Sequence, residues 1–221
     1  MGFFKTWSTD KGQNLANATQ KALQAASKGA SLIILPECFN SPYSTTKFRE
    51  YAEPLPTSPE PAKSPSFVAL AQMAKDTVYS PQRELLAFHR KIHLFDIDVP
   101  SGMSFYESDT LSAENKTTIM DLEGYGKIGL GVCYDMRFAE LSTIAARQGA
   151  SALVYPSAFN TTTGPLHWEL LGCARAADNQ DIVYALLDSE TIKRNRMANP
   201  ITYQRRHDVY PDIGNLVQLD K

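Results

Sequence analysis

The chain has 221 residues, of which 43% are hydrophobic and 21% are charged, with a formal net charge of −2 and a pI near 6.1. This composition suits one globular domain over residues 1–221 and gives no positive field that would favour nucleic acid as a partner. No apolar run approaches the roughly 20 residues that cross a bilayer, and residues 1–6 lack a secretory apolar core. We therefore expect a protein that acts on a small molecule, binds no membrane and is cytoplasmic, with a mitochondrial location as the alternative.

The first predicted elements are a helix over residues 14–28 and a strand over residues 31–35. Apolar residues recur at helical spacing in the first segment, and Gly29 supplies a C-terminal stop. Residues 31–35 are apolar without alternation and end at Pro36, as in a strand that is covered on both faces. Glu37 is then expected just past a strand end.

A proline-rich loop over residues 54–65 and a helix over residues 66–75 precede an alternating segment, residues 85–95. The alternation indicates a strand. One side carries Leu86, Phe88, Ile92 and Leu94, and the opposite side carries Ala87, His89, Lys91, His93 and Phe95.

The second half of the chain repeats a strand followed by a helix. A strand over residues 127–132 leads through Cys133 into a helix over residues 135–147, and a strand over residues 152–155 leads into a helix over residues 165–178. Strands separated by helices indicate an α/β layered fold.

Residues 29–40 and 149–160 resemble each other as a short internal repeat, called the echo below. Both segments begin Gly-Ala-Ser, and both carry Pro, Phe and Asn at equivalent spacing. Glycine, proline and asparagine fix backbone shape, so the echo predicts a shared geometry and two halves related by pseudosymmetry. Ser157 stands where the first copy has Glu37.

Cys133 is the candidate nucleophile because it falls between a strand end and a helix start. The helix dipole and the backbone N–H groups there lower the pKa of a thiol, and the N–H of Tyr134 is expected to face an oxyanion. The alternative for Cys133 is a buried structural cysteine. We interpret Cys38 and Cys173 as packing residues.

Glu37 and Lys91 are the candidate partners of the thiol. A partly desolvated carboxylate after a strand suits a proton shuttle, although a solvated loop acid fits the same position. An ammonium that points into a pocket would stabilise an oxyanion, whereas a cluster of cations is usually a solvated or anion-binding face. His89 and His93 lie four residues apart, but no carboxylate or cysteine completes a ligand set, so we expect no metal.

Three segments resemble the signature blocks of the carbon–nitrogen hydrolase (nitrilase) superfamily: residues 35–39 (LPECF), 89–95 (HRKIHLF) and 131–138 (GVCYDMRF). Residues 38–43, 95–98 and 157–168 look like its omega-amidase branch, which deamidates α-ketoglutaramate and α-ketosuccinamate. The resemblance implies an α/β fold, the α-β-β-α four-layer sandwich, that needs no metal and no organic cofactor.

The same resemblance implies residue roles. Glu37 is the general base, Lys91 is the oxyanion cation, Cys133 is the nucleophile, and Glu107 orients the catalytic groups. We expect Tyr43 or Arg137 to hold the far carboxylate of a keto-acid amide, and we expect the chain to pair as a homodimer.

The sequence departs from the family pattern at three places. The strand before the first helix, a pair of strands between residues 79 and 85, and a segment after residue 180 are missing. Missing strands leave unpaired edges and exposed apolar surface. The alternatives are therefore a non-catalytic or unstable deletion variant, a defective gene model, or a related nitrile or N-carbamoyl hydrolase.

Overall fold

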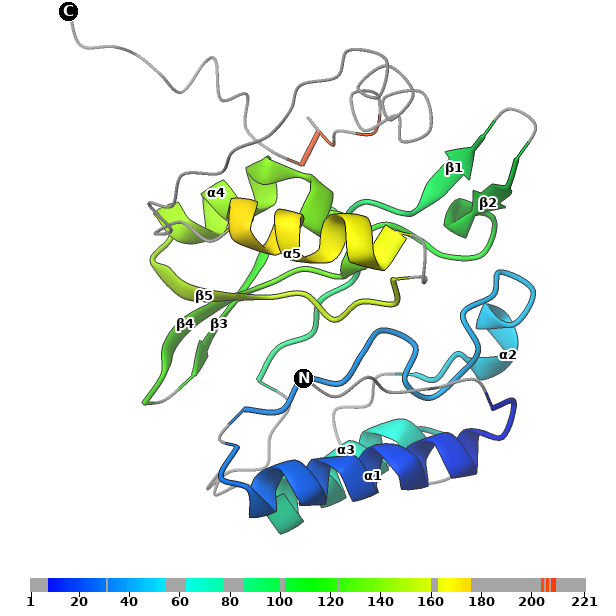
Figure 1. Ribbon diagram of the computed structural model, residues 1–221, viewed down its shortest axis with the longest axis vertical. Coiled ribbons are helices and arrows are strands. Elements are labelled where there is room, and N and C mark those ends of the chain that lie inside the picture. The colour runs from blue at the N-terminus through cyan, green and yellow to red at the C-terminus, as the bar shows by residue number, and fades with distance from the viewer. Residues whose placement is uncertain are drawn as a thin grey trace, which may run out of the picture. The chain divides into compact units, whose positions relative to one another are not determined.

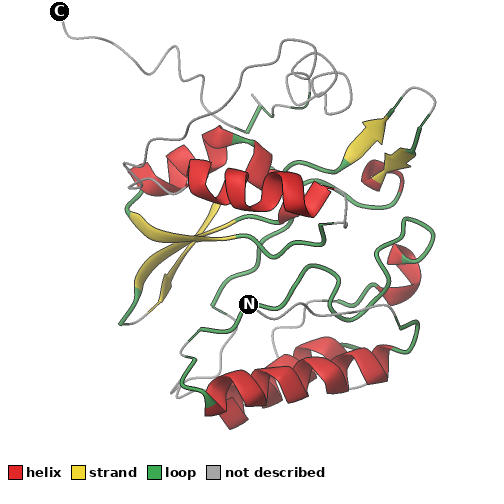
Figure 2. Ribbon diagram, viewed as in Figure 1, coloured by secondary structure: helices red, strands yellow, loops and turns green. Residues whose placement is uncertain are grey.

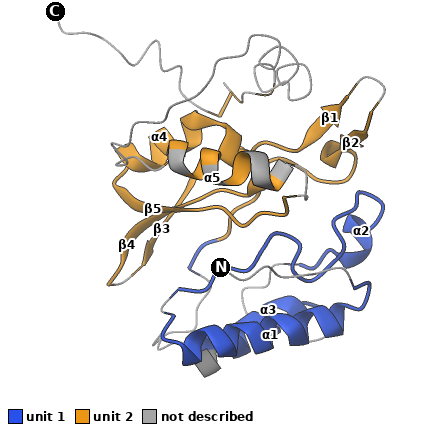
Figure 3. Ribbon diagram, viewed as in Figure 1, with its two compact units in different colours: residues 1–87 blue, residues 88–221 orange. Residues whose placement is uncertain are grey.

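The computed structural model describes residues 8–30, 32–54, 63–77, 86–99, 102–122, 124–159 and 163–175, together with residues 204, 206, 208 and 209. The chain divides into two compact units, Met1–Ala87 and Phe88–Lys221 (Figure 3). A single domain over residues 1–221 stays a prediction. No helix among the described residues is long and apolar enough to cross a membrane.

In the described part of the first unit there are three helices, α1 (Lys11–Ser27), α2 (Phe48–Tyr51) and α3 (Pro65–Thr77) (Figure 1). The Asp10 carboxylate begins α1 by accepting a hydrogen bond from the Gln13 N–H at 3.0 Å, which satisfies one of the free N–H groups at the helix start. The predicted helices over residues 14–28 and 66–75 are confirmed as α1 and α3. The predicted loop over residues 54–65 lies mostly outside the described residues.

The core of the first unit lies between α1 and α3. Ala18 and Ala22 of α1 are buried against Met73 of α3. Alanines four residues apart on one helix face let the two helices approach closely. Partly buried apolar side chains complete this cluster: Ile33, Leu35, Phe39 and Ala69.

The predicted strand over residues 31–35 is wrong for its described part. Residues 32–36 contain no strand, and Leu32 and Ile34 are each 47% exposed, while Ile33 and Leu35 pack on the core. The segment therefore buries only every second side chain. A strand needs a hydrogen-bonding neighbour, and the described residues of the first unit include no other strand.

The described residues of the second unit form two small sheets (Figure 2). β1 (Asp96–Asp98) pairs antiparallel with β2 (Ser104–Tyr106). In the other sheet β4 (Gly126–Leu130) lies between β3 (Thr118–Leu122), which is antiparallel to it, and β5 (Ala150–Val154), which is parallel. The predicted strands over residues 127–132 and 152–155 are thus confirmed as β4 and β5, each with slightly different ends.

Among the residues of this unit that the structure describes, four helical segments accompany these sheets: the 3₁₀ turns η1 (Glu107–Asp109) and η2 (Cys133–Arg137), and the helices α4 (Ala139–Arg147) and α5 (Thr163–Arg175). The single helix expected over residues 135–147 is corrected to η2 followed by α4, because the chain turns extended at Phe138. The helix expected over residues 165–178 is α5, and residues 176–178 lie outside the described residues. α4 contacts both β4 and β5.

The predicted strand over residues 85–95 is also wrong, because residues 86–95 are described and contain no strand. The alternation in burial covers only residues 86–90, and there it has the opposite sense to the prediction. Leu86 is 55% and Phe88 is 44% exposed, whereas Lys91, Ile92 and His93 are 7%, 0% and 2% exposed. The segment therefore alternates at its exposed start and is buried on both sides at residues 91–93.

The echo between residues 29–40 and 149–160 is reproduced at its glycines. Gly29 and Gly149 follow α1 and α4 with φ of 84° and 85°, the left-handed conformation that ends a helix. The segments after them differ, because β5 pairs with β4 whereas residues 32–36 have no strand pairing. The shared geometry covers the helix ends and not the strands.

Candidate active site

Cys133 is the first residue of the η2 turn, and residues 131–132 connect it to the end of β4. Its φ is 43°, an uncommon value for any residue other than glycine. Its N–H donates to the Pro156 carbonyl at 2.8 Å, and the Gly131 N–H donates to the Val154 carbonyl at 3.0 Å. The turn is therefore held against the end of β5, and Cys133 as a residue is partly exposed. Strained turns of this type commonly carry nucleophiles at functional sites.

Lys91 and Glu107 form a buried ion pair. The Lys91 Nζ lies 3.0 Å from the Glu107 Oε1, and the two side chains are 6% and 0% exposed. The other oxygen of Glu107 accepts the Phe95 N–H at 2.6 Å. Glu107 therefore holds the Lys91 ammonium with one oxygen and the backbone at Phe95 with the other. It is a buried acid and not a surface one.

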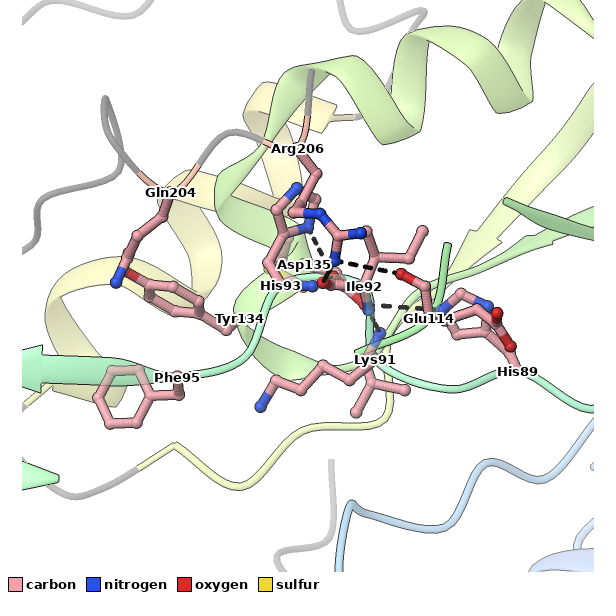
Figure 4. A network of polar contacts seen from close by, with 12 residues as sticks. His89, Lys91, Ile92, His93, Phe95, Glu114, Tyr134, Asp135, Gln204 and Arg206 are labelled. Carbon is pink, nitrogen blue, oxygen red and sulfur yellow. Dashed lines mark hydrogen bonds and ion pairs between the residues drawn. The ribbon is translucent and has the colours of Figure 1, made fainter. Parts of the chain in front are cut away.

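Asp135, two residues after Cys133, is fully buried and joins the Cys133 turn to the Lys91 segment (Figure 4). Its oxygens accept the N–H of Val132 at 2.9 Å and the N–H of His93 at 2.8 Å. The Nδ1 of His93 lies 2.7 Å from the Oδ1 of Asp135, and the Nε2 of His89 lies 3.6 Å from the Oδ2, beyond normal hydrogen-bond length. His89 and His93 therefore surround a carboxylate.

The pKa of Asp135 reflects these contacts. Burial by itself would raise the pKa of this carboxyl, but the interactions with His89 and His93 and the Val132 N–H outweigh burial and hold the pKa at about 2. Asp135 is therefore an anion throughout the neutral range.

Tyr134 and Arg137 form an aromatic and cationic cluster on η2. Tyr134 is 2% exposed, its hydroxyl donates to the Oε1 of Gln204 at 2.6 Å, and burial raises its pKa to about 12. The Arg137 guanidinium lies 5.6 Å from the centre of the Tyr134 ring and 3.2 Å from the Nδ1 of His167. Burial lowers the pKa of Arg137, and negative charge on Tyr134 or Cys133 opposes this shift. Arg137 therefore lies within electrostatic reach of the thiol.

Glu37 and Tyr43 belong to the first unit. Glu37 is partly buried and precedes Cys38, whose φ of 53° is again in the left-handed region. The Tyr43 ring packs edge-on against Phe48, with 5.5 Å between ring centres. The contacts described above bring Lys91, Glu107, Tyr134 and the Cys133 turn together within the second unit, and they do not include Glu37 or Tyr43.

Comparison with known proteins identifies the family. A model of the carbon–nitrogen hydrolase family matches residues 4–78 and 76–186. Omega-amidase NIT3 of Saccharomyces cerevisiae is 40% identical over 270 residues, with 94% of this chain and 92% of that protein covered. Omega-amidase NIT2 of Mus musculus is 48% identical over 188 residues, with 78% of this chain and 68% of that protein covered. The chain belongs to the carbon–nitrogen hydrolase family.

The structure agrees with this assignment. The crystal structure of Saccharomyces cerevisiae Nit3, a member of branch 10 of the nitrilase superfamily, matches this carbon–nitrogen hydrolase with a TM-score of 0.67 at 36% identity, covering 90% of this chain and 92% of the other. The predicted α/β fold of the nitrilase type is confirmed, as is the resemblance to the omega-amidase branch.

The sequence comparison with NIT3 supports the prediction that parts of the family pattern are missing, and the positions of the gaps stay a prediction. The alignment with NIT3 extends over 270 residues but covers 94% of 221 residues, or about 208, so about 60 aligned positions have no counterpart in this carbon–nitrogen hydrolase. Residues 32–35 and 86–95 have no strand pairing, although the sequence predicts strands over residues 31–35 and 85–95.

The sequence predicts no role for Asp135, Gln204 or Arg206, which all belong to this site. Gln204 bonds Tyr134 and the Asp96 carbonyl, and Arg206 bonds the Ile92 and Glu114 carbonyls. The available signal was the placement of His89 and His93 on the same side of the alternating pattern as Lys91. Among the described residues, no group of His, Cys, Asp and Glu side chains could hold a metal ion.

Proposed function

We propose that this carbon–nitrogen hydrolase is an omega-amidase, which hydrolyses the terminal amide of a small keto acid to a dicarboxylic acid and ammonia. α-Ketoglutaramate and α-ketosuccinamate are the substrates we favour. The observation that carries the proposal is the link between the strained Cys133 turn and the buried pair of Lys91 and Glu107. Similarity to proteins named omega-amidases supports the substrate class.

In the mechanism that we propose, Cys133 attacks the amide carbon as a thiolate. Glu37 accepts the thiol proton and gives it to the departing ammonia, and a water activated by the same carboxylate then opens the thioester. The assignment of Glu37 as the base rests on the LPECF block and on its partly buried position after the core segment.

Lys91 is proposed to stabilise the oxyanion. Its ammonium is almost completely buried, and the side chain extends away from the Asp135 network (Figure 4). A buried cation next to Glu107 costs less free energy to keep charged than an isolated one, and it needs no reorganisation when negative charge develops. The Tyr134 N–H is the second proposed donor to the oxyanion.

Arg137 is the proposed partner of the distant substrate carboxylate, with Tyr43 as a second candidate. Arg137 combines burial, two aromatic neighbours and proximity to the thiol, and its fork of N–H groups can hold a carboxylate with two hydrogen bonds. A neutral substrate that lacks this carboxylate should therefore show a higher KM.

The proposal is tested by ammonia release from α-ketoglutaramate. The wild type and Cys38→Ala should release ammonia, and Cys133→Ala should not. Cys38 is a matched control because it is also partly exposed and also has a positive φ. Ammonia release by Cys133→Ala, or an inactive wild type that unfolds cooperatively, would contradict the assignment.

A non-catalytic deletion variant is the second candidate, and a specific observation favours it. About 60 aligned positions of NIT3 are absent, and Leu32, Ile34, Leu86 and Phe88 are exposed where strands were expected. Such a variant would bind no amide productively. Hydrolysis of a nitrile or an N-carbamoyl compound in place of the amide would instead indicate a related hydrolase.

A homodimer in the cytoplasm belongs to the same proposal. Exposed apolar side chains favour association, and light scattering coupled to size-exclusion chromatography tests it. A mass equal to one chain at micromolar concentration would contradict the dimer.

A further inference from the structure

The Asp135 carboxylate connects two segments that are far apart in the sequence. Val132, the residue before Cys133, donates its N–H to the Oδ2 of Asp135 at 2.9 Å. His93, two residues after Lys91, donates its N–H to the Oδ1 at 2.8 Å, and the Ile92 N–H lies 3.4 Å from the Oδ2. One carboxylate therefore accepts hydrogen bonds from the backbone on both sides of the site.

The surroundings of Asp135 hold this carboxylate in one orientation. The His93 side chain donates from its Nδ1 to the Oδ1 of Asp135 at 2.7 Å, because an ionised carboxylate can only accept. The His93 ring is stacked on the Phe138 ring, with 3.6 Å between centres and 4° between planes. Asp135 and His93 are both shielded from solvent, with 0% and 2% of their surface exposed.

We propose that Asp135 is a positioning residue that sets the distance between the Cys133 thiol and the Lys91 ammonium. Asp135 touches no substrate in this scheme and acts only through the two backbone segments it binds. The inference rests on the proposed roles of Cys133 and Lys91. A displacement of about 1 Å between catalytic groups can lower a rate on the order of a hundredfold, so a single buried connector can limit kcat.

The pattern of contacts favours positioning over simple charge compensation. A carboxylate that only balanced histidine charge would need the His93 ring and no backbone donors. Asp135 instead binds the residues next to the two proposed catalytic side chains, Val132 beside Cys133 and Ile92 beside Lys91. Loss of this carboxylate should therefore affect the chemical step more than substrate binding.

The first test is steady-state kinetics of Asp135→Asn and His93→Asn with α-ketoglutaramate, on the full chain. We expect kcat to fall at least about tenfold in both, with KM changed less than about threefold, because substrate contacts are retained. The double variant should be no worse than the more impaired single variant, since the two side chains act as one unit.

Glu114→Gln is the matched control. Glu114 is also a buried carboxylate of the second unit, at 9% exposure, but its side chain accepts from the adjacent Asn115 N–H at 2.9 Å. The same change of charge there should leave kcat within about twofold of the wild type, because the Glu114 carboxylate bonds the neighbouring residue and not the Cys133 turn.

The second test uses the pH dependence of Cys133 alkylation by iodoacetamide, followed by peptide mass spectrometry. Removing a nearby negative charge would by itself lower the pKa of the thiol. Positioning predicts the opposite, because a thiol that moves away from Lys91 loses stabilisation of its thiolate. We expect the alkylation midpoint to rise in Asp135→Asn and to stay unchanged in Glu114→Gln.

The outcomes are decisive in combination. If Asp135→Asn shows no cooperative unfolding and is therefore not folded, the kinetics of His93→Asn decide the test. If neither variant folds, Asp135 is a structural residue and the proposal is overturned. Wild-type kcat in a folded variant, or a lowered alkylation midpoint, also overturns it. An inactive wild type with a raised midpoint in Asp135→Asn would overturn the omega-amidase proposal and leave the positioning role supported.

Discussion

Lys91 and Glu107 show how one buried contact determines the character of two residues. From its type alone, each residue could be a solvated charge on the surface. The structure excludes this for both, because the side chains lie 3.0 Å apart and are almost fully buried. A buried ion pair is expensive to break, since the remaining charge is left without compensation.

Glu107→Gln should therefore lower both stability and activity. The change leaves the Lys91 ammonium without its carboxylate, and we expect a loss of about 3 kcal/mol in the free energy of unfolding. Urea denaturation measures it. Glu50→Gln, which removes one partner of the exposed pair between Lys47 and Glu50, should leave the urea midpoint unchanged. Equal effects of the two substitutions would contradict the account.

Asp135 predicts a pH dependence of stability with a definite sign. Its pKa is held at about 2 in the folded chain, below the ordinary value of 3.8. Its contribution, on the order of 2 kcal/mol, is therefore present above about pH 4 and is lost as the pH falls toward 2. The difference in unfolding free energy between wild type and Asp135→Asn should shrink across this range. A difference that grows on acidification would show that the sign is wrong.

At the level of elements, the sequence predicts local structure better than strand pairing. α1, α3, β4, β5 and α5 were expected close to where they are found, because helical spacing, caps and turn glycines act over a few residues. Residues 32–36 and 86–95 have apolar patterns typical of strands but no strand in the structure. Pairing depends on neighbours that are distant in sequence, and such neighbours cannot be read from the segment itself.

The same limit applies to the site: its local features are predicted by the sequence, and its long-range contacts are not. The Cys133 turn follows from a strand, a glycine-containing connection and a helical turn, all of which are local. The burial of Glu107 and the role of Asp135 depend on contacts with residues 12 to 43 positions away. The alternating pattern places His89, Lys91 and His93 on one side, but it does not identify their distant partners, and only the resemblance to a family pointed to Glu107.

Gly131→Ala tests the element that presents the thiol. A Cβ at position 131 would lie 2.5 Å from the Cε1 of Tyr155, so either the ring or the Cys133 turn must move. We expect a loss of about 1 to 3 kcal/mol in unfolding free energy and a lower kcat. Gly172→Ala in α5, where a Cβ would meet nothing within 4 Å, should be neutral or stabilising. Wild-type activity and stability in Gly131→Ala would contradict this packing.

For the whole molecule, the missing segments have a physical consequence. Apolar side chains that face solvent contribute little to stability and promote association. Leu32→Thr combined with Leu86→Thr should therefore change the free energy of unfolding by less than about 0.5 kcal/mol and reduce aggregation on heating, because these side chains are 47% and 55% exposed. Light scattering during a thermal ramp measures the effect.

Leu141→Ala is the control for that experiment. Leu141 is 3% exposed and packs against Ile92, so its truncation should cost about 2 to 5 kcal/mol. If the surface substitutions destabilise the chain as strongly as Leu141→Ala does, residues 32 and 86 are buried in solution by a partner or by another arrangement of the chain.

The central claim is that the Cys133 thiolate forms a covalent acyl intermediate. Acid quenching during turnover of α-ketoglutaramate, followed by peptide mass spectrometry, tests it most directly. We predict a thioester of the keto acid on the peptide that contains Cys133, sensitive to hydroxylamine and absent in Cys133→Ala. Ammonia release at the wild-type rate with the acyl group on Cys38, or with no acylated cysteine under conditions that trap thioesters, would contradict the claim.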